Sequence, residues 1–91
     1  MPRPKKNRCV SCNPTANYYK PQGIPLKFLD EIILERDEFE AINLADFENL
    51  LHEDAAERMK VSRATFGRII KSARNKIAEC IITGKAIKIN N

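Results

Sequence analysis

The sequence predicts a mainly α-helical domain of three helices, preceded by an irregular segment and followed by a short strand. Apolar residues recur at three- and four-residue intervals between residues 37 and 82, the spacing of buried helix faces. All five prolines lie in the first 25 residues, which opposes regular structure there. At 91 residues the chain has the size of one small domain. We therefore expect a basic arm and loop packed on the body over residues 1–25, and the helical domain over 26–91.

Charge is unevenly distributed along the chain, although the formal net charge is only +4. Residues 1–29 carry six basic and no acidic side chains, residues 30–57 one basic and eleven acidic, and residues 58–91 nine basic and one acidic. The basic ends suit a polyanionic partner, which the acidic middle would face away from. The alternative is a fold in which these charges simply pair with one another.

The sequence indicates no membrane partner. No apolar run approaches the ~20 residues that cross a bilayer. The basic N-terminus lacks the apolar region of a secretory signal. We therefore expect the protein in the cytoplasm.

The first eight residues form a basic arm with two prolines. Its cations Arg3, Lys5 and Lys6 suit contacts with phosphates or with a minor groove. The alternative is a frayed terminus without a role.

Cys9 and Cys12 form a C-x-x-C pair, which has the spacing of half a zinc site. A zinc site needs four ligands, and the rest of the chain offers only Cys80 and His52, neither in a second paired motif. We therefore expect no metal and no other cofactor. A regulator that senses zinc or redox state through Cys9 and Cys12 stays open as an alternative.

Before the first helix, Leu26–Leu29 is expected to form a short helical turn, and Ile32–Leu34 is a short apolar run. Asp37-Glu38-Phe39-Glu40 has the D-x-x-E pattern of a capping box. It predicts a helix from this point through about Phe47.

Two further amphipathic helices follow, joined by a very short connection at Lys60-Val61. The first covers about His52–Met59 and has the small residues Ala55 and Ala56 on one face. The second covers about residues 62–82, with Ser62 as its N-cap and Gly84 just past its end. Its expected buried positions are Phe66, Ile69, Ile70, Ala73, Ile77, Cys80 and Ile81. This pattern is typical of a DNA-binding helix-turn-helix, whose second helix enters the major groove.

Most candidate DNA-binding residues lie on the outward face of that second helix, opposite Phe66 and Ile77, and Arg63 flanks its first turn. Arginine suits guanine edges or phosphates, and lysine suits phosphates. Gly67 costs about 1 kcal/mol relative to alanine inside a helix, so its value would be close approach, either to the duplex or to a neighbouring helix. The candidates are Arg63, Ala64, Arg68, Lys71 and Asn75, with Ser62 and Thr65 able to reach phosphates.

The tail Lys85–Ile89 alternates polar and apolar residues as a short strand does. Because a lone strand is unstable in water, it needs a partner. The candidates are Arg8–Val10 or the same tail of a second subunit. The second would give a homodimer suited to two half-sites.

Residues Leu34–Ile77 resemble the helix-turn-helix of region four of bacterial sigma factors, most closely from Ala55 to Phe66. Compared with that pattern, Lys60 stands where glycine is common, and Leu51 stands where serine or threonine is common. The whole chain also resembles a family of small uncharacterised prokaryotic proteins described as DNA-binding. The matching stretches are Met1-Pro2-Arg3-Pro4, Tyr19-Lys20-Pro21, Asp37-Glu38-Phe39-Glu40-Ala41 and Gly84-Lys85-Ala86-Ile87.

These observations predict sequence-specific binding to double-stranded DNA, as a transcriptional regulator. The first alternative is a protein-interaction module of the transcription machinery, which would contact RNA polymerase or a regulator through the acidic middle. No enzyme is expected. The only histidine is His52, and no carboxylate pair, nucleophile with its base, or phosphate-binding loop is recognisable.

Overall fold

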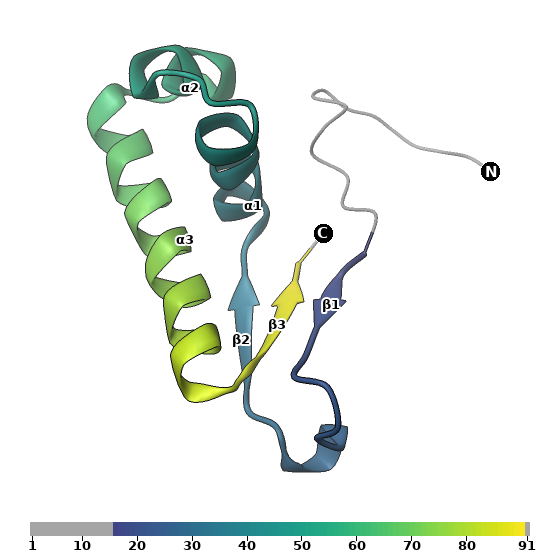
Figure 1. The fold of residues 1–91 in the computed structure, drawn as a ribbon. Helices are drawn as coiled ribbons and strands as arrows, with labels where there is room; N and C mark the ends of the chain where they lie inside the picture. The colour runs from purple at the N-terminus through teal and green to yellow at the C-terminus, as the bar shows by residue number, and fades with distance from the viewer. Residues whose placement is uncertain (1–15, 91) are drawn as a thin grey trace, which may run out of the picture.

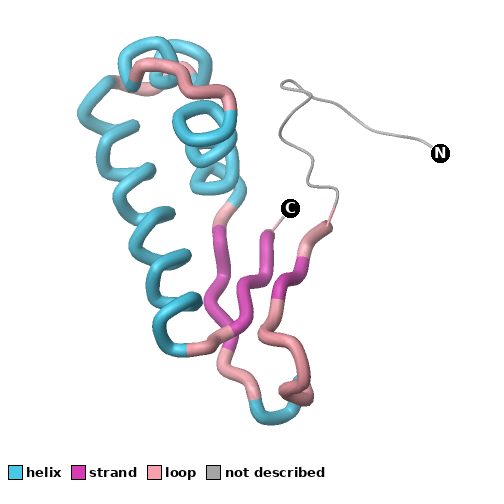
Figure 2. Tube along the Cα trace, in the orientation of Figure 1, coloured by secondary structure: helices cyan, strands magenta, loops and turns pink. Residues whose placement is uncertain are grey.

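The structure is a computed structural model that describes residues 16–90. It is mainly helical, with a small three-stranded sheet at one end (Figures 1 and 2). The longest helix, α3, runs from α2 at the opposite end of the molecule down to the sheet (Figure 1). In chain order the elements are β1 (Tyr18–Tyr19), a 3-10 turn (Leu26–Phe28), β2 (Glu31–Leu34), α1 (Arg36–Ile42), a π-helical turn (Asn43–Phe47), α2 (His52–Met59), α3 (Arg63–Thr83) and β3 (Ala86–Ile89).

Helix α1 begins earlier than the D-x-x-E pattern predicts. Its N-cap is Glu35, and the capping box joins Glu35 to Glu38, whose carboxylate accepts the backbone N–H of Glu35 at 2.8 Å. The predicted box from Asp37 to Glu40 is therefore wrong by two residues. The earlier box prevails because Glu38 is buried and also bonds to α3, a contact that lies outside the local pattern. The predicted extent through Phe47 is confirmed, since the π-helical turn continues α1 to that residue.

The short connection predicted at Lys60-Val61 joins α2 to α3. Lys60 adopts the left-handed conformation (φ 61°, ψ 42°), and the N–H of Val61 donates to the carbonyl of Ala56 at 3.0 Å. Ser62 then caps α3, because its Oγ accepts the backbone N–H of Thr65 at 3.0 Å. At the other end, Gly84 stops α3 in the left-handed region (φ 75°).

Two apolar clusters hold α3 in place. The first joins it to α1 and α2, and the second packs it against the sheet through Ala73, Leu34 and Ile89. Cys80 is buried as predicted, but the expected burial of Ile81 is wrong, because Ile81 is 73% exposed. Cys80 faces β3, with its Sγ 3.6 Å from the Ala86 carbonyl, and the next residue is rotated by about 100° away from it. The members of the first cluster are Ala41, Leu44, Ala45, Ala55, Ala56, Phe66 and Ile70.

The tail strand β3 lies in the middle of the sheet, whose strand order is β1-β3-β2. It is antiparallel to β1 and parallel to β2, with Tyr19 opposite Ile87 and Leu34 opposite Ile89. The strand itself was predicted. Its partners within residues 16–90 are β1 and β2, which fill both of its edges, in place of a second copy or of Arg8–Val10, which lies outside the described residues. A homodimer stays a prediction, and it would use another surface.

Candidate nucleic-acid interface

The candidate residues lie at the start of α3 and along its exposed side. Phe66, Ile70 and Ala73 are buried on the inner face. Thr65 is half-buried, and the other candidates are exposed: Ser62, Arg63, Ala64, Arg68, Lys71 and Asn75. The start of α3 therefore presents most of these candidates to solvent.

Ion pairs divide the cations of α2 and α3 into two groups. Arg74 makes a bidentate pair with Asp46, at 2.6 and 3.1 Å, and this hydrogen bonding raises the pKa of Arg74. Lys76 pairs with Glu38 at 2.7 Å, and Arg58 pairs with Glu48 at 3.2 Å.

The second group has no such partner. Arg63, Arg68 and Lys71 form no ion pair with any residue of the described range 16–90. We call these three residues the open basic face. Charge pairing within the fold therefore explains why Arg58, Arg74 and Lys76 are present, but it does not explain the cations of the open basic face.

The side chain of Arg68 is oriented by a short chain of hydrogen bonds along α3. Its Nη2 donates to Thr65 Oγ1 at 3.1 Å, and Ser62 Oγ donates to the same oxygen at 2.9 Å. Both hydroxyls are thus used within the first turn of the helix. Since a guanidinium carries five N–H donors, Arg68 keeps donors for a ligand.

Arg63 lines a cleft between the start of α3 and the start of α2. The other lining residues are Leu50, Leu51, His52 and Glu53. The His52 ring packs edge-on against Phe66, with centroids 5.2 Å apart. His52 therefore supports the core beneath the cleft.

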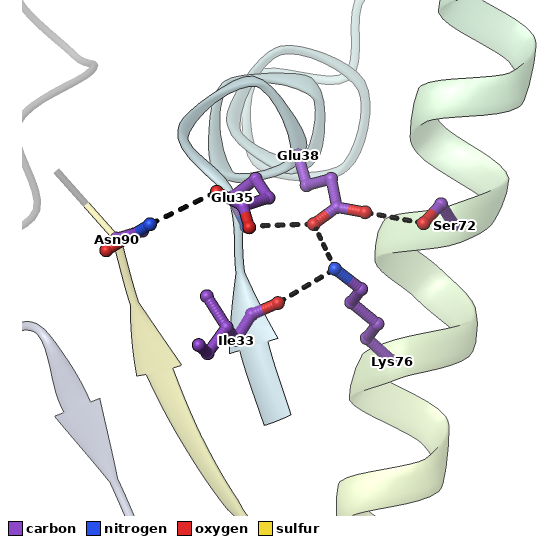
Figure 3. A network of polar contacts seen from close by, with 6 residues as sticks. All are labelled: Ile33, Glu35, Glu38, Ser72, Lys76 and Asn90. Carbon is purple, nitrogen blue, oxygen red and sulfur yellow. Dashed lines mark hydrogen bonds and ion pairs between the residues drawn. The ribbon is translucent and has the colours of Figure 1, made fainter. Parts of the chain in front are cut away.

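A polar network fixes α3 against α1 and β2 (Figure 3). The Glu38 carboxylate is only 6% exposed, and it accepts hydrogen bonds from Ser72, from Lys76 at 2.7 Å and from the backbone N–H of Glu35. Lys76 also donates to the carbonyl of Ile33 at 2.8 Å. These bonds join the middle of α3 to two other elements, so they set the direction in which its outward face points.

Opposing influences act on the pKa of Glu38. Burial is the largest, and it favours the neutral acid. The hydrogen bonds from Lys76, Ser72 and the Glu35 backbone, with the positive charge of Lys76, together outweigh burial and hold the pKa of Glu38 below its ordinary value. Glu38 is therefore ionised at neutral pH.

Several predicted residues lie outside the described range, namely Arg3, Lys5, Lys6, Cys9 and Cys12. Within residues 16–90, no group of three or more histidine, cysteine or acidic side chains could hold a metal ion. The helices of that range also include none long and apolar enough to cross a membrane. Burial raises the pKa of the Cys80 thiol, which disfavours the reactive thiolate.

Sequence reasoning missed one cation of this surface. Lys60 is exposed in the turn, two residues before the cap of α3. The signal was available in the sequence, because Lys60 comes shortly before the first turn of the helix that carries the other cations.

Comparison with known proteins places the chain in a family. Residues 1–91 match the family described as "Protein of unknown function DUF134". UPF0251 proteins of Thermoanaerobacter pseudethanolicus and Caldanaerobacter subterraneus are 53% and 55% identical to it, each over 98% of this chain and 75% of the relative. A UPF0251 protein of Vibrio vulnificus is 53% identical over 100% of this chain and 91% of the relative. No solved structure matches the chain. By these matches the chain belongs to the DUF134 (UPF0251) family of bacterial proteins of uncharacterised function.

Proposed function

We propose that this protein binds double-stranded DNA in a sequence-specific manner and regulates transcription. In this proposal α2, its turn and α3 act as a helix-turn-helix, and the first half of α3 enters the major groove. The observation that carries the proposal is the open basic face. Its three cations are exposed and lack ion-pair partners within residues 16–90, whereas Arg58, Arg74 and Lys76 on the same two helices are paired.

The dimensions of α3 suit this role. An α-helix is about 10–12 Å wide with its side chains, and the major groove of B-DNA is about 12 Å wide. Arg68 has the donors to bond the two acceptors of a guanine edge, and the methyl group of Ala64 suits contact with a thymine methyl. Arg63 and Lys71, at the flanks of that face, suit phosphates.

Titration of a labelled, random-sequence 30-bp duplex by fluorescence anisotropy at several salt concentrations tests the proposal. Wild-type protein should bind in a salt-dependent way, and Lys71→Ala should reduce the slope of log K against log[salt] by about one. Lys88→Ala is the matched control, since Lys88 is an exposed lysine on β3, at the other end of the molecule. The absence of salt-dependent binding by the wild type would refute DNA binding.

Specificity needs a second measurement. Selection of bound duplexes from a random pool should give a preferred site. On that site, Arg68→Ala should cost roughly 1–3 kcal/mol of binding free energy and relax the preference at one base position. An unchanged preference would remove Arg68 from the base-contacting residues.

A protein-interaction role is the second candidate, and exposed apolar residues favour it. Phe47 is 80% exposed and Leu51 is 66% exposed, next to the acidic side chains of Asp46, Glu48 and Glu53. Exposed apolar surface rimmed by charge is typical of a docking site. If this were the whole function, the duplex titration would show no salt-sensitive affinity. If both roles hold, Phe47→Ala should leave DNA binding unchanged.

A further inference from the structure

Gly67 is half-buried at the edge of the exposed side of α3, one helical turn from both Arg63 and Lys71. It is the only glycine within the helix, and its backbone is regular, since the positive-φ glycines are Gly23 and Gly84. Its conformation is therefore open to any L-residue.

Packing within residues 16–90 does not require this glycine either. Of the atoms in that range, a Cβ built at Gly67 would meet only Nη1 of Arg63, at 3.7 Å, which is ordinary van der Waals contact with the far end of a flexible side chain. Neither α1 nor α2 approaches this position. By contrast, the small residues Ala55 and Ala73 are fully buried against neighbouring elements.

Glycine is nevertheless among the least favourable residues in a helix interior, because it loses the most backbone entropy on folding. Alanine at position 67 would fit the free protein and would favour the helix. The fold gains nothing from the glycine, so its value must come from contact with something outside the described chain.

We propose that Gly67 is a DNA-contact residue, at which the backbone of α3 lies directly against the duplex. This inference rests on the proposed function and adds to it. The three cations of the open basic face lie within one turn of Gly67, and Ala64, one turn before it, is small and exposed. A helix without a side chain at this point lies deeper in the groove, which brings Arg63 and Lys71 to the phosphates and Arg68 to the base edges. A methyl group at position 67 holds the helix away from the bases and weakens all these contacts together.

The experiment compares wild-type protein with Gly67→Ala by thermal unfolding and by titration of the selected duplex. The variant should unfold at a higher temperature, by about 4–8 °C for a domain of this size. It should also bind the duplex about tenfold or more weakly. Higher stability with weaker binding is the combination that a purely structural role of Gly67 would not produce.

Ala78→Leu is the matched control. Ala78 is exposed on the same side of α3, eleven residues further on and about 16 Å along the helix axis. Leucine adds bulk there without opposing the helix, and it should leave duplex binding unchanged.

Each other outcome overturns the inference in a distinguishable way. If the wild type binds and Gly67→Ala binds equally well, close approach at Gly67 is wrong while DNA binding stands. If Gly67→Ala unfolds at a lower temperature or fails to fold, the glycine serves the fold. If the wild type shows no salt-dependent binding, the proposed function and this inference fall together.

Discussion

Replacement of the buried carboxylate of Glu38 tests how α3 is held. In Glu38→Gln the amide oxygen can still accept from Lys76 and from the backbone of Glu35, since both bond the same oxygen, Oε1. The hydroxyl of Ser72 can rotate to accept from the new NH2 group. Gln therefore removes the charge and keeps the shape of the network.

The loss in the free energy of unfolding depends on which hydrogen-bond donors and charges each variant leaves without a partner. Glu38→Gln takes the counter-ion from Lys76, whose side chain is 30% exposed and keeps its bond to the Ile33 carbonyl. Because water screens that charge in part, we expect a loss of about 1–2 kcal/mol in the free energy of unfolding. Glu38→Ala leaves all three donors without their acceptor, and we expect a loss of about 2–4 kcal/mol.

Because Glu38 is charged and Gln is not, the difference in the free energy of unfolding between wild type and Glu38→Gln should depend on pH. The pKa of Glu38 is lowered in the folded state, so between that value and the unfolded value of about 4.3 the unfolded chain binds more protons. The stabilisation is complete above the unfolded pKa and is lost as the pH falls through the folded pKa. The free energy of unfolding of wild type should therefore exceed that of Glu38→Gln by more at pH 7 than at pH 3.5.

Urea unfolding followed by circular dichroism at both pH values measures these quantities. Asp37→Asn is the control, because it removes an exposed acid from the first turn of the same helix. It should cost less than about 1 kcal/mol, the usual size of a helix-dipole contribution. The reasoning fails if Glu38→Ala costs no more than Asp37→Asn, or if the gap for Glu38→Gln is the same at both pH values.

Three further predictions concern the turn, the cap and the paired cations. Lys60→Gly should stabilise the protein by about 1 kcal/mol in urea unfolding, because Lys60 is left-handed, and a loss of stability would mean that its side chain packs. Ser62→Ala should cost about 1 kcal/mol in the same assay through loss of the cap of α3, and no change would show that water replaces it. Asp46→Asn removes the partner of Arg74, so DNA affinity should rise and the salt slope should steepen by up to about one, whereas a flatter slope would count against a phosphate contact by Arg74.

The sequence predicted α2, α3 and their turn because the signals for them are local. The cap at Ser62 and the stop at Gly84 each depend on a few neighbouring residues. Periodicity identified the buried face in the same way. It failed at Ile81, which is 73% exposed in the last turn of α3, just before the chain turns back into β3.

The sheet could not be predicted, because its pairings join distant parts of the chain. Strand β1 has two residues, and the apolar run in β2 fits a strand or a buried helix equally well. The parallel pairing of β2 with β3 exists because α3 carries the chain back along the molecule to Ala86 (Figure 1). The choice between the boxes at Glu35 and Asp37 was likewise decided by a tertiary contact, that of Glu38 with Ser72.

The acidic middle of the chain determines where positive charge remains on α3. Asp46 neutralises Arg74, and Glu38 neutralises Lys76, whereas the three cations of the open basic face form no ion pair within residues 16–90. Positive potential is thereby concentrated on the first three turns of the helix.

Helix α2 has the opposite character, because Glu53, Asp54 and Glu57 are exposed on it. These acids would repel phosphates if α2 lay along the duplex. The exposed cations of α3 would attract an approaching DNA molecule, and the exposed acids of α2 would repel it. This charge pattern suits a complex in which α3 contacts the DNA and α2 lies away from its phosphates.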